Sequence, residues 1–378
     1  MAKHNIYLDY AAATPLEAPI IKAMKPYLSD FFYNPSSLYE PARQVKRDLA
    51  EARHTIARIL GTNASDIIFT AGATESINLA LQSFDTHVIS AIDHQAVHAA
   101  AGTQAKIVAV DSVGRLDMSA LREAIDDSTQ IVSIGYVNNE IGTIQHMQEI
   151  ACLVKEVRRH RPPDTPLWLH TDASQAPGIV DLNVERLGVD MMTLNAAKIY
   201  GPKQVGLLWA RPQVHLNPLI RGGGQEKVRR SGTENVAGVI GFAAALERAE
   251  KKRAQETKRF NQLRHRCKKT LLDAFPDCVI SGPSKHVAAH IFHVSFPDID
   301  AERVVFALEA QGVYVATGAA CAANTDKRSH VLDAIGLDAS LQQGSIRLSF
   351  GRPTSEKDVA TALRAIIDCV KQEYNRES

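Results

Sequence analysis

Cysteine is scarce in this sequence, with only five among 378 residues. No two of them form a Cys-x-x-Cys pair, which argues against a zinc ribbon or a cysteine-ligated cluster, so no metal site is expected. An odd and low number also argues against a disulfide scaffold and favours a reducing compartment. The five are Cys152, Cys267, Cys278, Cys321 and Cys369.

An excess of one charge and long apolar runs are also lacking. The 43 basic and 42 acidic residues give a net charge of +1, so the global charge favours neither nucleic acid nor an anionic membrane. No run of about 18 apolar residues is present, which argues against a membrane span. The first residues show no apolar stretch typical of a signal peptide. We therefore expect a cytoplasmic protein that contacts neither membranes nor nucleic acid directly.

The composition that is present is that of an ordinary globular protein, with 45% hydrophobic and 22% charged residues. The length allows two domains or one large one. Short runs that are apolar on both faces alternate with helical patterns, which predicts a mostly parallel sheet covered by helices on both sides. The predicted strands are 66–70, 87–91, 106–110, 130–137, 167–171, 191–194 and 206–210. Ligands bind such sheets at the edge formed by the carboxyl ends of the strands.

The pattern changes after residue 234. One long helix, or two in series, is predicted over 234–275, and short strands and helices follow to the end of the chain. We therefore expect the α/β class, with a large domain over 14–250 and a smaller α+β domain over 1–13 and 251–378. The long helix is basic between Arg248 and Lys269, which fits a solvated connector or a nucleic-acid patch. Aromatic residues typical of the patch are nearly absent.

Two charged residues follow predicted strands of the large domain. Lys198 follows the strand at 191–194, and an amine held beside apolar residues can have a lowered pKa and attack a carbonyl group. Asp172 follows the strand at 167–171, where a buried carboxylate needs a donor partner such as a protonated ring nitrogen. A surface lysine and an aspartate that caps a turn are the alternatives.

Two more segments are expected at the same edge. The segment 70–78 joins a strand end, a glycine and a helix start, whose free amides can bind a phosphate. N-capping by Thr74 is the alternative. His94 follows the strand at 87–91, where it can stack on a flat ring, move protons or cap a helix.

Three other features point to anions or to thiol chemistry. The loop 221–235 combines three glycines with several arginines and can reach an anionic ligand. Arg347 lies in a short apolar strand, where it needs a substrate carboxylate or a structural salt bridge. Cys321 lies among small residues that suit an accessible, reactive thiol. Cys152 and two other cysteines fall in helical patterns that favour buried packing.

Together and in this order, these segments resemble the cysteine desulfurases of the IscS/NifS type, which are pyridoxal-phosphate enzymes of fold type I in the class V aminotransferase group. The resemblance runs from YLDYAAATP at residue 7 and NPSS at residue 34 through GATESINLA, VNNEIGTIQ, HTDASQAPG, KIYGPK, GGGQE, RSGTENVAG and GAACAA to IRLSFGRPT. It implies a cofactor-binding large domain with a seven-stranded sheet, and a small domain that carries the catalytic cysteine loop.

The resemblance also implies roles for single residues. Lys198 matches the lysine that holds the cofactor as a Schiff base, Cys321 the thiol that accepts sulfur, and His94 the histidine stacked on the ring, which can also assist proton movements. The other implied cofactor contacts are Asp172 at the ring nitrogen, Gln175 at the ring hydroxyl, Asn139, and Ala73, Thr74, Asn195 and, from the second subunit of a homodimer, Thr233 at the phosphate. The implied substrate contacts are Asn34, Asn139 and Arg347, with Arg347 on the carboxylate.

The chain departs from the family pattern beside the lysine. Where the family usually reads Ser-x-His-Lys, this chain reads Asn195-Ala-Ala-Lys198. Asn195 can donate one hydrogen bond to a phosphate, and Ala197 can donate none. Losing one donor to a charged group costs roughly 1.5–3 kcal/mol, or about one to two decades of affinity, so we expect weaker cofactor retention. Gln204 replaces a usual glycine, and Ala319 a usual serine.

The implied activity is removal of sulfur from L-cysteine, with release of L-alanine and a persulfide on Cys321 for an acceptor protein. The spacing from Cys321 to Val331 matches the subgroup with the longer cysteine loop. Iron–sulfur cluster assembly and thiolation of tRNA, a cofactor or DNA are all compatible destinations of the sulfur. Selenocysteine lyase or another pyridoxal-phosphate reaction on the same scaffold, and a low-activity scaffold for sulfur-transfer partners, are the alternatives.

Overall fold

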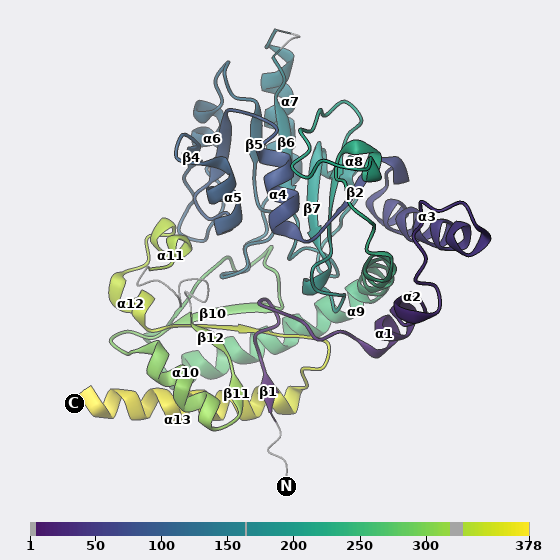
Figure 1. Ribbon diagram of the computed structural model, residues 1–378. Coiled ribbons are helices and arrows are strands. Elements are labelled where there is room, and N and C mark those ends of the chain that lie inside the picture. The colour runs from purple at the N-terminus through teal and green to yellow at the C-terminus, as the bar shows by residue number, and fades with distance from the viewer. Residues whose placement is uncertain (1–4, 163–164, 318–327, 378) are drawn as a thin grey trace.

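The computed structural model describes residues 5–162, 165–317 and 328–377. Helices flank a large sheet, and a smaller unit with its own sheet lies below it (Figure 1). The first strand, β1 (Ile6–Tyr7), and the last helix, α13 (Glu356–Glu377), both belong to this smaller unit.

The large sheet has seven strands in the order β2-β8-β7-β6-β5-β3-β4. Neighbours pair in parallel except at β8, which is antiparallel to β2 and β7. The strands are β2 (Ile67–Thr70), β3 (His87–Ser90), β4 (Lys106–Val108), β5 (Ile131–Ser133), β6 (Trp168–Asp172), β7 (Met191–Asn195) and β8 (Gly206–Ala210). The predicted mostly parallel, seven-stranded sheet is confirmed.

Alternate residues of these strands are buried on opposite faces. Ile67 and Phe69 belong to one apolar cluster, and Ile68 between them belongs to another. Both faces are therefore covered, which explains why the strands read as continuous apolar runs. The first cluster includes residues of α3 (Glu40–Leu60), α6 (Met118–Ala124), α7 (Met147–Arg159), α8 (Val184–Leu187) and α9 (Val236–Ala274); the second includes residues of α4 (Ala73–Leu81) and α5 (Gln95–Ala101).

One strand is shorter than predicted. The apolar run 130–137 predicted a strand over its whole length, but β5 ends at Ser133. The backbone N–H of Gly135 donates to Oδ1 of Asp93 at 2.6 Å and not to β3. The N–H groups of Ile134 and Tyr136 still donate to β6, and the chain then continues as a loop at the carboxyl edge of the sheet.

The smaller unit contains an antiparallel sheet in the order β12-β13-β10-β9. Its strands are β9 (Val279–Ile280), β10 (Ile291–Ser295), β12 (Ala316–Thr317) and β13 (Ser345–Ser349). The chain between residues 313 and 317 is divided between two sheets, because β11 (Val313–Tyr314) pairs with β1 whereas β12 pairs with β13. The remaining helices are α1 (Ala18–Met24), α2 (Pro26–Ser29), α10 (Ala301–Ala310), α11 (His330–Ala334) and α12 (Ala339–Gln343).

Helix α9 is one continuous helix of 39 residues that packs against both units. Phe242 and Leu246 are buried in the cluster of the large sheet, and Phe260 and Leu263 in the cluster of the smaller unit. The predicted domain boundary at residues 250 and 251 falls inside this helix and stays a prediction. Among the described residues, no helix is both long and apolar enough to cross a membrane.

Candidate active site

A cavity of about 340 Å³ opens at the carboxyl edge of the large sheet, where the sequence predicted a site. Loops after five of the strands and one strand of the smaller sheet meet there. The predicted site residues that line it are Ala73, Thr74, His94, Asn139, Asp172, Gln175, Asn195, Lys198 and Arg347. The structure thus brings most of the predicted set into one place, while the role of each stays a prediction.

Lys198 ends a short 3₁₀ turn, Ala196–Lys198, that follows β7. The turn is capped by Asn195, whose Oδ1 accepts the backbone N–H of Ala197 at 3.1 Å. The Lys198 amine is partly buried and donates to the carbonyl oxygens of Ala11 at 2.9 Å and Ala12 at 2.7 Å. The N-terminal segment therefore holds the amine at the cavity wall.

Backbone strain follows directly after this lysine. Tyr200 has a φ of 65° and Gln204 a φ of 59°, both in the left-handed region that favours glycine. A left-handed backbone at residue 204 explains why a glycine is usual there in the resembling family. Gln204 tolerates it at a cost of about 1–2 kcal/mol.

Asp172 and His94 approach the cavity from β6 and from the loop after β3. Oδ1 of Asp172 accepts the N–H of Ser174 at 3.0 Å and its hydroxyl at 2.6 Å, so the carboxylate both caps a turn and lines the cavity. His94 caps α5, since its Nδ1 accepts the N–H of Ala96 at 3.1 Å. Desolvation lowers the pKa of His94; nearby Asp172 opposes this effect and Lys198 adds to it. The ring is therefore mostly neutral at pH 7.

The first turn of α4 faces the cavity without a side-chain cap. Its N-cap residue is Gly72, with a φ of 145°, so the alternative of N-capping by Thr74 is wrong. A Cβ on Gly206 of β8 would lie 2.7 Å from the Gly72 backbone, which shows how closely this loop packs on the sheet. The amides of Ala73 and Thr74 and the helix dipole are suited to binding an anion, and this role stays a prediction.

Asp93 is a cavity residue that the sequence analysis missed. It is 3% exposed, and its carboxylate accepts the N–H groups of Ser90 at 2.8 Å and Gly135 at 2.6 Å. Burial raises its pKa to about 7, although both amides oppose the shift. Asp93 thereby fixes the loop that carries His94 against the loop after β5. The sequence offered one signal for Asp93, namely an acidic residue directly before His94 and just after a predicted strand.

Arg347 reaches the cavity from the middle of β13 and is 3% exposed. Its terminal nitrogens donate to Oδ1 of Asp9 at 2.6 Å and to the carbonyl oxygen of Asn139 at 3.0 Å. The arginine therefore forms a structural ion pair and also lines the cavity. Asp9 was missed, because only the fold brings residues 9 and 347 together.

Three predicted residues are not in this cavity as described. Asn34 and Thr233 are exposed and do not line it. Thr233 was predicted to act in a second subunit, which one chain does not test. Cys321 lies outside the described residues. Of the other cysteines, Cys152 is exposed on the outer face of α7, so the expectation that it is buried is wrong.

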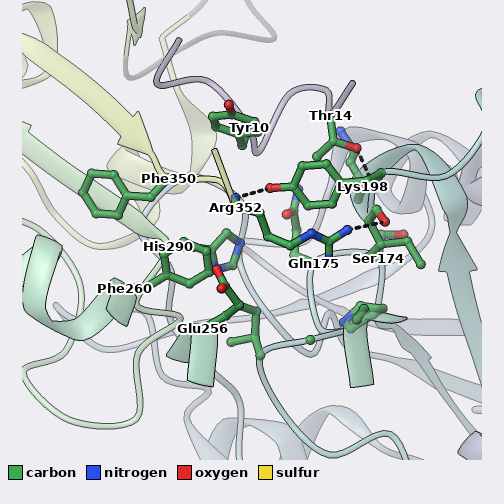
Figure 2. Close-up of a pocket in the computed structure, with 16 residues that line it drawn as sticks. Tyr10, Thr14, Ser174, Gln175, Lys198, Glu256, Phe260, His290, Phe350 and Arg352 are labelled. Atoms are coloured by element: carbon green, nitrogen blue, oxygen red, sulfur yellow. Dashed lines mark hydrogen bonds between the residues drawn. The ribbon is translucent and has the colours of Figure 1, made fainter. Parts of the chain in front are cut away.

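A smaller cavity lies on another side of Lys198 and shares Ser174 and Gln175 with the first. Figure 2 shows Tyr10, His290 and Arg352 around it. The guanidinium of Arg352 lies 3.8 Å from the ring centroid of Tyr200, and the Tyr200 hydroxyl accepts the backbone N–H of Arg352 at 2.6 Å. These contacts brace the turn that carries Lys198.

The residues of the larger cavity fit pyridoxal phosphate, the cofactor that the resemblance implies. The cavity has an amine for the aldehyde, a carboxylate for the ring nitrogen and the α4 amides for the phosphate. Asn195 uses its oxygen on Ala197, which leaves its amide nitrogen for the phosphate. Among the described residues, no group of three or more His, Cys, Asp or Glu side chains could hold a metal ion.

Comparisons with known proteins identify the family of this chain. The family model of class-V aminotransferases matches residues 6–361. The chain is 37% identical to the cysteine desulfurase IscS of Dictyoglomus turgidum, over 94% of this chain and 92% of that one. It superposes on a NifS-like protein with a TM-score of 0.89 at 32% identity, covering 97% of this chain and 99% of the other. A structure of SspA in complex with cysteine gives a TM-score of 0.76 at 29% identity, over 91% and 98% of the two chains. The chain belongs to the class-V aminotransferase family, as the resemblance predicted.

Proposed function

We propose that this chain is a pyridoxal-phosphate-dependent cysteine desulfurase, which converts L-cysteine to L-alanine and retains the sulfur. The main support is the convergence of Lys198, Asp172 and the first turn of α4 on one cavity that Arg347 also lines. The relatives named cysteine desulfurase IscS, and the related structure that contains cysteine, support this choice over other reactions of the family.

Each cavity residue has a task in this reaction. When bound, pyridoxal phosphate supplies an electron sink for negative charge at the substrate Cα. Nζ of Lys198 takes the Cα proton, and the carboxylate of Asp172 would pair with the ring nitrogen. Arg347 binds the substrate carboxylate. His94, largely neutral because desolvation lowers its pKa, accepts and returns a proton at the cavity mouth.

Sulfur transfer is assigned to Cys321. Its thiolate attacks the substrate sulfur, so a sulfur–sulfur bond forms while the Cβ–sulfur bond breaks. The electron pair of the broken bond stays with the substrate, which takes up a proton and leaves as alanine. The product on the protein is a Cys321 persulfide, which an acceptor protein then receives.

A pair of cysteine variants tests the assignment. Cys321→Ser should abolish persulfide and alanine formation while cofactor binding persists. Cys152→Ser removes an exposed thiol on α7 and should behave as the unmodified protein. The measurements are protein mass after exposure to L-cysteine, which reports the added sulfur atom, and alanine yield. Persulfide formation by the Cys321→Ser variant would disprove the role of this thiol.

We also propose a cytoplasmic homodimer. Large apolar side chains are exposed near the start of α3, including Phe32 and Leu38, and in the loop before α9, including Ile220 and Val228. A second copy of the chain would bury them, with Thr233 reaching the partner's phosphate. Hybrid dimers test this: mixing inactive Lys198→Ala and weakened Thr233→Ala chains should restore one intact site. No recovery after subunit exchange would contradict the shared site.

A further inference from the structure

His293 lies directly opposite Arg347 in the antiparallel pair of β10 and β13. The residues on either side of His293, Phe292 and Val294, belong to the apolar cluster of the smaller unit. Because side chains alternate along a strand, His293 and Arg347 share the opposite face, which borders the cavity. Directly opposed residues have Cβ atoms about 5 Å apart, so the two side chains are neighbours.

Three polar atoms at this position lack a hydrogen-bond partner among the described residues. They are both ring nitrogens of His293 and Nε of Arg347. His293 is 0% exposed, so water does not replace the missing partners at its surface. Buried polar atoms without partners are rare and costly, and three of them on two adjacent residues call for a functional reason.

The imidazole of His293 is uncharged. Burial is the main cause that lowers its pKa to about 3, and the nearby positive charge of Arg347 is the second. A neutral ring carries one N–H and one lone pair, and the lone pair is an acceptor suited to the Nε–H of Arg347. The neutral ring also leaves the positive charge of Arg347 available, with Asp9 as its carboxylate partner.

We propose that His293 is a positioning residue that orients the guanidinium of Arg347 toward the carboxylate of the amino-acid substrate. The inference rests on the proposed function, in which Arg347 binds that carboxylate. When the substrate carboxylate draws the terminal nitrogens toward itself, the ring of His293 accepts the Nε–H and fixes the plane of the guanidinium. His293 acts only through Arg347 and does not touch the substrate.

The test compares His293→Leu with His293→Asn in the cofactor-loaded protein. We expect His293→Leu to raise the KM for L-cysteine about tenfold, the value of one hydrogen bond to a charged group, and to change kcat less than about twofold. His293→Asn, which keeps an acceptor, should recover most of the loss. Calorimetric titration with L-alanine should show the same tenfold weakening without turnover. The inhibition constant of cysteamine, which has no carboxylate, should not change.

His290→Leu is the matched control. His290 is also buried and neutral, with a pKa lowered to about 3, but it lies at the smaller cavity, and Arg264 perturbs it more than Arg347 does. Equal losses of stability in both leucine variants, with an unchanged KM for L-cysteine, would overturn the inference. Equal weakening of L-cysteine and cysteamine would do so too. His293→Met repeats the measurement if leucine prevents folding.

Arg347→Gln separates this inference from the proposed function. The measured quantity is the preference for L-cysteine over cysteamine. If Arg347→Gln keeps the preference of the unmodified protein, the assignment of Arg347 to the substrate carboxylate fails. If Arg347→Gln loses the preference and His293→Leu keeps it, only the positioning role of His293 fails.

Discussion

Two fully buried histidines, one in each sheet, are held in opposite ways. His170 in β6 has partners at both ring nitrogens, the Ser133 hydroxyl at 2.8 Å and the Thr193 hydroxyl at 3.0 Å. His293 in β10 has none among the described residues, and it lies opposite Arg347 in the neighbouring strand. Burial lowers the pKa of both rings, to about 4 for His170 and about 3 for His293.

The contrast separates His170, which is structural, from His293, whose role depends on the neighbouring Arg347. The large sheet bonds the polar side chains buried in its described strands, and it presents its cavity residues at the carboxyl ends of the strands and on the loops that follow. The small sheet places a cavity residue, Arg347, on a strand itself, so cross-strand neighbours such as His293 take part in the site. Substitutions at the edge of the large sheet should therefore lower kcat, whereas substitutions in the strands of the small sheet should weaken substrate binding and stability.

The largest effect is expected on the loop side of this comparison. Lys198→Ala removes the amine that takes the substrate proton, and we expect kcat to fall by about 10⁴-fold or more. Thermal unfolding should change little, because the amine is only partly buried and water can replace it at the carbonyl oxygens of Ala11 and Ala12. Alanine formation from L-cysteine measures the loss. Retention of more than a hundredth of the activity would contradict the role of Lys198.

On the strand side, binding and stability should change together. Arg347→Gln removes the cation from the substrate carboxylate and from Asp9, so we expect a KM about 100-fold higher and a free energy of unfolding about 2–3 kcal/mol lower. Arg347→Lys should recover most of the stability but only part of the KM, because lysine lacks the planar fork. Steady-state kinetics and urea unfolding check both. An unchanged KM would remove Arg347 from the substrate site.

The next effect concerns the departure beside Lys198. Ala197→His restores a donor that the resembling family has at this position, and we expect cofactor affinity to rise about 10- to 100-fold. Equilibrium dialysis of the protein against pyridoxal phosphate gives the affinity directly. The affinity of the Asn195→Ser variant for pyridoxal phosphate provides a comparison at the other position where this chain departs from the family pattern. An unchanged affinity in Ala197→His would show that this side chain does not face the phosphate.

The last effect is a pH dependence of stability that the two histidines share and that leaves catalysis unchanged in His170→Gln. The pKa of His170 is 6.5 in the unfolded chain and about 4 in the folded protein. Between these two pH values the ring binds a proton in the unfolded chain but not in the folded protein. Stability from this group is therefore complete above pH 6.5 and is lost as the pH falls. The unmodified protein should have a higher free energy of unfolding than His170→Gln at pH 7, and this difference should shrink by about 3 kcal/mol between pH 6.5 and pH 4. The KM should not change.

Urea unfolding between pH 7.5 and 4 measures this difference. The unmodified protein should lose its advantage over His293→Asn with the same sign, because the pKa of His293 is also lowered. His293 differs from His170 in lying opposite Arg347, which lines the cavity. An advantage of the unmodified protein that grows in acid would contradict the buried, neutral state of either ring.

Much of the sheet and part of the site could be predicted from the sequence. The strands of the large sheet follow from short apolar runs, and Asp172 and Lys198 are apparent because each directly follows such a run. The end of β5 could not be predicted, because it depends on a side-chain bond from Asp93 across 42 positions. Likewise, Asp9 and His293 become significant only after the fold places them beside Arg347. Local patterns locate reactive residues, whereas the contacts that orient them are long-range.

The length of α9 has a mechanical consequence. A continuous helix of 39 residues is a rod about 58 Å long, and it is anchored by buried side chains in both apolar clusters. A hinge between the two units would have to break backbone hydrogen bonds in the middle of this rod. The helix therefore resists bending between the unit that carries Lys198 and the unit that carries Arg347, so the cavity that both residues line suits substrates of one length.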